Sequence, residues 1–172
     1  MISNEINEIF DQYIIKARKE KNRNRKILHI SLIILTVAVI FSLFGFARIT
    51  SDSMEPTYIE GQFIIFTKLN NEYEKNDIVI IDYNGQKILR RIVGVSGDLV
   101  DIDNNLGELS INGIAEESNQ LTVTDQVGIK FPIYITKDQV FVLCDKRNNT
   151  TDSRRIGCIN VEDIIGKVIF SI

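Results

Sequence analysis

One long apolar stretch near the start of the chain dominates the pattern of apolar and polar positions. Residues 27–47 read ILHISLIILTVAVIFSLFGFA, 21 residues without a formal charge while His29 is neutral. About 20 apolar residues span a bilayer core as an α-helix, so this stretch predicts a transmembrane helix. A buried core helix of this length without a charged face is rare. Gly45 and Ala47 form a small-x-small pair, as before a signal-peptide cleavage site, but signal-peptide apolar regions are shorter, at about 7–15 residues.

Beyond Arg48 the pattern changes to short apolar runs separated by turn residues, which is typical of β-strands. We expect strands at residues 62–67, 77–83, 87–95, 99–103, 108–111, 139–143 and 167–172. Asn-Gly pairs stand at residues 84–85 and 112–113, and the first is a strong hairpin signal. Residues 113–131 are polar and irregular, which favours a long loop, and a short helical period is confined to residues 161–165.

The charges around the apolar stretch indicate its orientation. Seven basic residues precede it closely, opposed there only by Glu20: Lys16, Arg18, Lys19, Lys21, Arg23, Arg25 and Lys26. Such a run is most often a solvated segment, but here it flanks an apolar span that only Arg48 follows closely. Because cytoplasmic flanks carry the excess of Lys and Arg, we expect a cytoplasmic N-terminus and an extracellular C-terminal domain at the cell membrane.

The chain is therefore expected to have three parts. Residues 1–26 form a cytoplasmic basic segment, residues 27–47 a single transmembrane helix, and residues 48–172 an extracytoplasmic, mainly β domain of antiparallel strands. At the start of the chain, apolar residues recur at helical spacing between Ile2 and Ile14. That spacing fits a short amphipathic helix on the membrane or on a partner, and it equally fits a segment without regular structure.

Composition narrows the classes of function. The net charge is −3 with 25% charged residues, so bulk charge gives no sign of nucleic-acid binding. The two cysteines, Cys144 and Cys158, lie on the outer side, where a disulfide is permitted but not required. The single histidine, His29, lies in the apolar stretch. We therefore expect no metal site and no cofactor in the β domain.

Three motifs follow the apolar stretch in order. They are SDSMEPT at residues 51–57, RRIVGVSGD at 90–98 and CDKRNNTTDSR at 144–154, with a weaker NDIV at 76–79. Read alone, the first is an ordinary turn. Together they resemble the S-x-S-M-x-P-T, K-R-x-x-G-x-P-G-D, G-D-N-R-x-x-S-x-D-S-R and G-D-I-V motifs of type I signal peptidases. That family consists of membrane-anchored serine proteases with a Ser-Lys dyad, and a single short anchor with a small domain is similar to its Gram-positive branch.

The resemblance implies roles for individual residues. Ser53 stands at the nucleophile position, and the Ser53 N–H and Ser51 hydroxyl stand where the family stabilises the oxyanion. Thr150 occupies the place of a serine that orients the family's lysine, although an ordinary turn residue fits there equally well. The remaining supporting positions are Asp145, Arg147, Asp152, Ser153 and Arg154, of which Asp152 and Arg154 match a buried ion pair beneath the site.

The second motif departs from the family at the position of the general base, which is Arg90. A serine hydroxyl is a weak nucleophile until a base takes its proton, and a guanidinium cannot serve as that base. Lys87 lies three residues away, so on a regular strand it faces the other side, about 10 Å along the chain. Lys146, which replaces the family's asparagine, is a more remote alternative. Cys144 and Ser96 replace the family's glycine and proline.

Two functions follow from the resemblance. The first is a divergent signal peptidase that cleaves extended signal peptides of secreted preproteins at the outer face of the membrane. The second is a catalytically inactive relative, a chaperone or assembly factor, with pilin or sortase components as partners in sortase-dependent pilus assembly. A soluble self-cleaving repressor with a similar dyad is disfavoured by the apolar anchor and by the lack of a DNA-binding segment.

Overall fold

A computed structural model describes residues 2–69, 72–103, 107–116, 129–149 and 151–172. The chain has two compact units, residues 1–42 and residues 43–172. The first is occupied by helix α1 (Ile2–Leu43), whose part from Arg18 to Leu43 has the length and composition to cross a membrane. Among the described residues, no other helix has this property. The basic segment is part of the same helix.

The end of the helix differs from the expected boundary at Ala47. Helix α1 ends at Leu43, and strand β1 (Phe44–Arg48) follows directly, paired with β2 (Phe63–Thr67). Hydropathy does not distinguish an apolar helix from an apolar strand, which is why the sequence placed residues 44–47 in the helix. Gly45 allows this pairing, because a Cβ atom there would lie 2.2 Å from the Phe66 ring. Beyond the glycine, aromatic residues favour the extended backbone.

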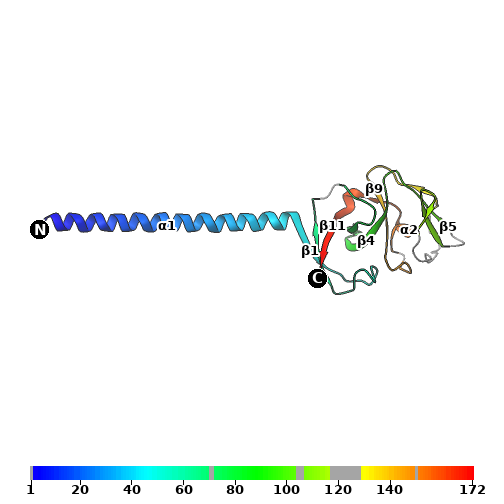
Figure 1. The fold of residues 1–172 in the computed structure, drawn as a ribbon, viewed down its shortest axis with the longest axis horizontal. Coiled ribbons are helices and arrows are strands. Elements are labelled where there is room, and N and C mark those ends of the chain that lie inside the picture. Colours follow the sequence, from blue (N-terminus) through cyan, green and yellow to red (C-terminus); the bar gives the residue numbers. More distant parts are fainter. Residues whose placement is uncertain (1, 70–71, 104–106, 117–128, 150) are drawn as a thin grey trace. The chain divides into compact units, whose positions relative to one another are not determined.

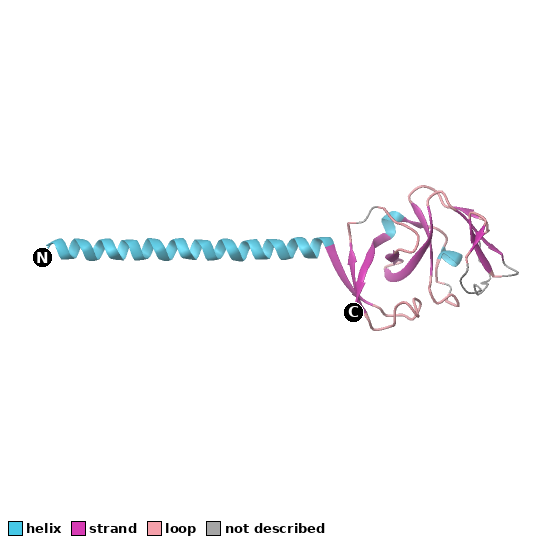
Figure 2. Ribbon diagram, viewed as in Figure 1, coloured by secondary structure: helices cyan, strands magenta, loops and turns pink. Residues whose placement is uncertain are grey.

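The β domain contains two sheets in which every described pairing is antiparallel (Figures 1 and 2). The larger has the strand order β1-β2-β11-β3-β4-β9-β10, and the smaller β7-β6-β5-β8. The remaining strands are β3 (Ile78–Tyr83), β4 (Gln86–Val95), β5 (Leu99–Asp103), β6 (Glu108–Ile111), β7 (Ile114–Ala115), β8 (Ile133–Tyr134), β9 (Gln139–Leu143), β10 (Ile159–Asn160) and β11 (Ile164–Ser171). Helix α2 (Ser153–Ile156) and 3-10 helix η1 (Val161–Asp163) complete the domain. The expected mainly β, antiparallel fold class is confirmed.

The two Asn-Gly turns form as their sequence indicates. Asn84 and Gly85 have φ of 52° and 77°, the left-handed values that a two-residue hairpin turn requires, and they join β3 to β4. Asn112 and Gly113 have φ of 55° and 77° and join β6 to β7. Strand β7 thus lies inside the expected long loop at 113–131, of which residues 117–128 are outside the described part.

The helical period at residues 161–165 is only partly confirmed. One 3-10 turn, η1, occupies Val161–Asp163, and strand β11 begins at Ile164. The sheet decides this outcome, because Ile164 pairs with Ile81 and is buried against the larger sheet. Strands β7, β8 and β10 were not predicted from the sequence, because two residues are too few to show a recognisable alternation of apolar and polar positions.

Three apolar clusters form the core of the β domain. One lies between the sheets around Phe141, and a second lies on the larger sheet around Ile81 and Ile92. The third, around Ile49, Ile64, Phe66 and Ile80, lies beneath the segment that leads to Ser53. Both cysteine thiols are free, with Cys144 buried and Cys158 partly exposed, so the structure contains no Cys144–Cys158 disulfide.

Candidate active site around Ser53

Ser53 lies in a tight turn that the apolar core holds in place. The turn is closed by backbone hydrogen bonds from the Glu55 N–H to Asp52 (3.0 Å) and from the Tyr58 N–H to Met54 (2.9 Å). Met54 is completely buried, which anchors the turn, and Ser53 itself is only 2% exposed. The first motif thus combines an anchoring methionine with a serine whose hydroxyl points into the domain.

Arg90 reaches this hydroxyl from the middle of strand β4. Its side chain is buried, and its Nη1 atom donates a hydrogen bond of 2.9 Å to the Ser53 Oγ atom. The structure therefore brings together the two residues that the motifs place at the nucleophile and base positions. Their chemical roles stay predictions.

Backbone carbonyls fix the rest of the Arg90 guanidinium. Nε and Nη2 both donate to the Thr151 carbonyl, at 2.8 and 2.5 Å, and Nη1 also donates to the Leu89 carbonyl at 2.5 Å. The Thr151 contact was missed by sequence reasoning, because a main-chain carbonyl leaves no signal in residue type. Thr150, which the motif places beside the base, lies outside the described residues.

Ser51 lies next to the candidate nucleophile. The two hydroxyl oxygens are 3.0 Å apart, a hydrogen-bond distance at which either can donate. Ser51 is exposed while Ser53 is buried, so Ser51 lies at the surface end of a short polar path to Arg90. This position suits the role of an oxyanion donor, which stays a prediction.

Lys146, the alternative candidate for the base, contacts two carboxylates. Its backbone N–H donates to the Ser53 carbonyl at 3.0 Å, but its ammonium contacts the carboxylates of Asp52 and Glu55, the latter at 3.0 Å. The hydrogen bond with Asp52, and then that with Glu55, holds the pKa of Lys146 above its ordinary value. A general base needs the opposite shift, because it must lose its proton near neutral pH. These contacts disfavour Lys146 as an alternative base.

The third motif contains a buried ion pair, as the resemblance implied. Asp152 is completely buried and Arg154 is 3% exposed, and they are joined by contacts of 2.9 Å (Nε to Oδ1) and 2.7 Å (Nη2 to Oδ2). The same carboxylate accepts hydrogen bonds from the backbone N–H groups of Cys144 and Arg154. Between the pair, the Ser153 hydroxyl accepts from the Val142 N–H at 2.9 Å. These residues therefore support the turn that carries Thr151.

The other charged residues of the third motif also have partners. Asp145 accepts two hydrogen bonds from Arg91, at 2.7 and 2.6 Å, and Arg147 pairs with Glu116 at 3.1 Å. Arg91 was quoted within the second motif, but its role was missed, since a sequence alone does not show that it pairs with Asp145. Both pairs attach the third motif to other parts of the domain. Within the described residues, no group of His, Cys, Asp and Glu side chains could hold a metal ion.

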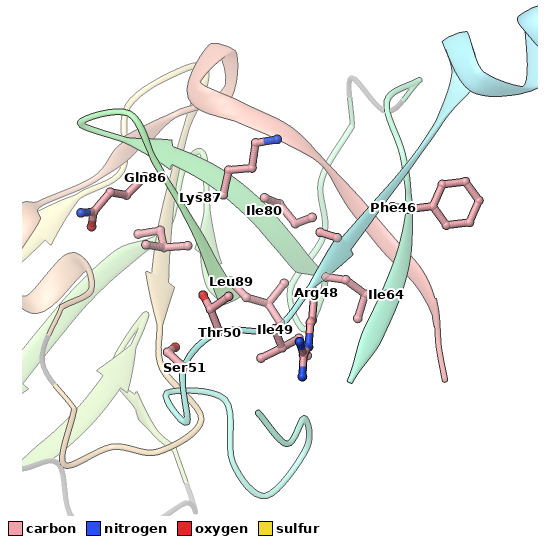
Figure 3. A pocket seen from close by; sticks show the side chains of 12 residues that line it. Phe46, Arg48, Ile49, Thr50, Ser51, Ile64, Ile80, Gln86, Lys87 and Leu89 are labelled. Carbon is pink, nitrogen blue, oxygen red and sulfur yellow. The ribbon is translucent and has the colours of Figure 1, made fainter. Parts of the chain in front are cut away.

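A groove of about 660 Å³ begins beside Ser51 (Figure 3). One wall is residues 46–51 and the other is residues 86–89 of β4, with Ile64 and Ile80 at the floor. Figure 3 shows the Ile49 and Leu89 side chains lying side by side between these walls. Of residues 63–66, Ile64 lines the groove, whereas Phe63 and Phe66 do not. Phe63 is 56% exposed, and Phe66 is buried under Gly45.

The groove walls include two strand edges without a partner among the described strands. Strand β1 is the end strand of the larger sheet. Strand β4 pairs with β9 only from Arg91 onward, so residues 86–90 pair on one side alone, with β3. Unpaired edges present free N–H and C=O groups that can accept an added strand.

The β domain thus combines a buried serine with a strand-edged groove, and it follows an apolar helix. Residues 23–172 match the family described as "Signal peptidase, peptidase S26". Signal peptidase I P of Bacillus subtilis subsp. natto is 29% identical over 171 residues, covering 86% of this chain and 90% of that protein. Signal peptidase I of Bacillus amyloliquefaciens is 34% identical over 134 residues, covering 69% and 68%.

Among solved structures, a crystal structure of a signal peptidase I from Enterococcus faecalis V583 is similar with a TM-score of 0.45 and 21% sequence identity. It covers 58% of this chain and 98% of that chain. From the family match over residues 23–172, the chain belongs to the signal peptidase family, peptidase S26. Together with the apolar helix, this membership indicates a membrane-anchored protein.

Proposed function

We propose that the protein binds extended segments of secreted preproteins at the outer face of the cell membrane, and that it cleaves them slowly or not at all. The observation that carries this proposal is the hydrogen bond from Arg90 Nη1 to Ser53 Oγ, 2.9 Å long. The family acts on preproteins and is membrane-associated. The orientation of the anchor follows from the basic residues that precede it.

The hydrogen bond holds Ser53 without activating it. A guanidinium has only donors and keeps its charge, so it withdraws electron density from Oγ and cannot accept the hydroxyl proton. Loss of a triad base in a serine protease lowers turnover by about 10⁴- to 10⁶-fold. The described surroundings of Ser53 offer no substitute, because the Lys146 ammonium is held by two carboxylates.

Peptide binding does not need a base. An extended segment in the groove can pair with the unpaired edges of β1 and β4, while alternate side chains enter the apolar floor. The same hydrogen bond therefore favours the second function, a non-catalytic chaperone or assembly factor that uses this groove. Pilin and sortase components as its partners stay predictions.

Cleavage by the full-length chain in detergent tests the proposal. With a preprotein that carries a small-x-small site, we expect no detectable turnover by the wild type and retained binding by Ser53→Ala. Arg90→Lys should gain slow cleavage, because an amine in this buried place can lose its proton. Arg91→Lys is the matched control and should gain none, since Arg91 pairs with Asp145. Wild-type turnover that exceeds that of Arg90→Lys and disappears in Ser53→Ala would refute the proposal.

A further inference from the structure

The groove has a charge character that differs from that of the whole chain. The chain carries a net charge of −3, yet none of the twelve described residues that line the groove is acidic. The two charged ones are both cations, Arg48 and Lys87. The residues that line the groove therefore present positive charge, and no negative charge, to a bound peptide.

The two cations differ in the contacts of their charged groups. The Arg48 Nε atom donates to the Gly61 carbonyl at 3.3 Å, and its guanidinium lies 5.9 Å from the centre of the Phe63 ring. Lys87 is exposed, and its side chain makes no hydrogen bond or ion pair with any described residue. Its cross-strand neighbour Asp82 instead accepts the Gly85 N–H at 2.9 Å in the hairpin turn.

The position of Lys87 on β4 defines a distance from the candidate nucleophile. Lys87 and Leu89 lie two residues apart, on the same face of β4, and both line the groove. Figure 3 shows the Lys87 side chain extending away from the Ser51 end of the groove. It lies three residues before Arg90, which contacts Ser53, and this is about 10 Å along a strand. An extended peptide covers the same distance with about three residues.

We propose that Lys87 selects peptides with an acidic side chain about three residues from the residue that lies beside Ser53. The proposal rests on the proposed peptide-binding function and names the class of peptide. It concerns recognition alone, so it applies whether or not the bound peptide is cleaved.

The test measures binding of fluorescent peptides to the full-length chain in nanodiscs of zwitterionic lipid. A reference peptide has alanine at the small-x-small positions and no charge nearby. Two further peptides carry Glu three residues before or three residues after the residue expected at Ser53, and two carry Lys there. Wild type, Lys87→Met, Lys87→Glu and the control Lys137→Glu are compared. Lys137 does not line the groove, so its substitution changes net charge alone.

We expect one Glu peptide to bind the wild type about 2- to 5-fold more tightly than the reference, which is the range for a partly exposed ion pair. The preference should disappear in Lys87→Met, reverse toward the Lys peptide in Lys87→Glu, persist in Lys137→Glu and weaken with added salt. Equal binding of all peptides by the wild type would overturn this inference and leave the groove-binding function standing. No binding of any peptide would overturn both.

Discussion

Replacing Asp152 by Asn removes one charge of a buried ion pair and leaves the other. Asp152 is completely buried, and its carboxylate accepts four hydrogen bonds, from two backbone N–H groups and from two nitrogens of Arg154. The amide keeps only part of this capacity, and the Arg154 guanidinium then stays buried without its counter-ion. Breaking a buried pair in this way costs about 3–5 kcal/mol. Since domains are typically stable by about 5–15 kcal/mol, this is about a fifth or more of the total.

The same substitution should loosen the candidate active site. Arg154 also donates to the carbonyls of Arg147 (2.7 Å) and Asn149, so the ion pair holds the third motif together. That motif supplies the Lys146 N–H to the Ser53 carbonyl and the Thr151 carbonyl to Arg90. Hydrogen exchange of backbone amides at residues 144–154 should therefore accelerate in Asp152→Asn under native conditions.

Chemical denaturation of the full-length chain, followed by circular dichroism, measures the change in the free energy of unfolding. Lys167→Ala is the control, because it removes an ion pair with Asp77 whose lysine is 30% exposed. Because this pair is only partly buried, with side chains 30% and 12% exposed, the control should change the free energy of unfolding by clearly less than Asp152→Asn. If Asp152→Asn costs no more than Lys167→Ala, the buried pair does not support the domain in the way argued.

Three further predictions address charge, thiols and topology. Burial opposes ionisation of Asp98, but hydrogen bonds led by the Val95 N–H outweigh it and lower its pKa below 3.8. The charged Asp98 carboxylate therefore stabilises the fold at pH values above 3.8. The stability lost in Asp98→Asn should shrink as the pH falls through the folded-state pKa of Asp98, and a loss that does not depend on pH would contradict this. Burial raises the pKa of Cys144 to about 12, and Cys144 is buried whereas Cys158 is partly exposed, so iodoacetamide at pH 8 should modify Cys158 first. Mass spectrometry of the chain without reduction should show no disulfide. Protease added to intact protoplasts should digest the β domain, whereas full protection would reverse the proposed topology.

The sequence predicted most of the β domain because its strands carry local signals. Short apolar runs and an Asn-Gly pair mark the hairpin at residues 78–95, and the strands at residues 99–103, 108–111 and 139–143 have the expected bounds. Strand β1 was not predicted, because its apolar residues continue the hydropathy of the helix. Here the long-range pairing with β2 decides the conformation, and no local pattern encodes it.

The site was predictable only as far as side chains define it. The motifs placed Ser53 near Arg90, and the structure brings these two into contact. The Thr151 carbonyl was beyond reach, since any residue type offers one. The Lys146 contacts with Asp52 and Glu55 were equally hidden, because they join motifs more than 90 residues apart.

Arg90 and Lys146, two departures from the family motifs, each place a cation in contact with the turn that carries Ser53. Arg90 donates to its hydroxyl, and Lys146 bridges the carboxylates on either side of it, Asp52 and Glu55. Each introduces a cation whose proton is retained, and each restrains the turn by contacts that a neutral asparagine or a deprotonated lysine would not make. Under the proposed function, such a site would orient a peptide carbonyl by donating hydrogen bonds but would offer no acceptor for the proton of an attacking hydroxyl. Arg90→Lys supplies a place for that proton while the Lys146 bridge remains, so its rate reports whether the base alone was missing.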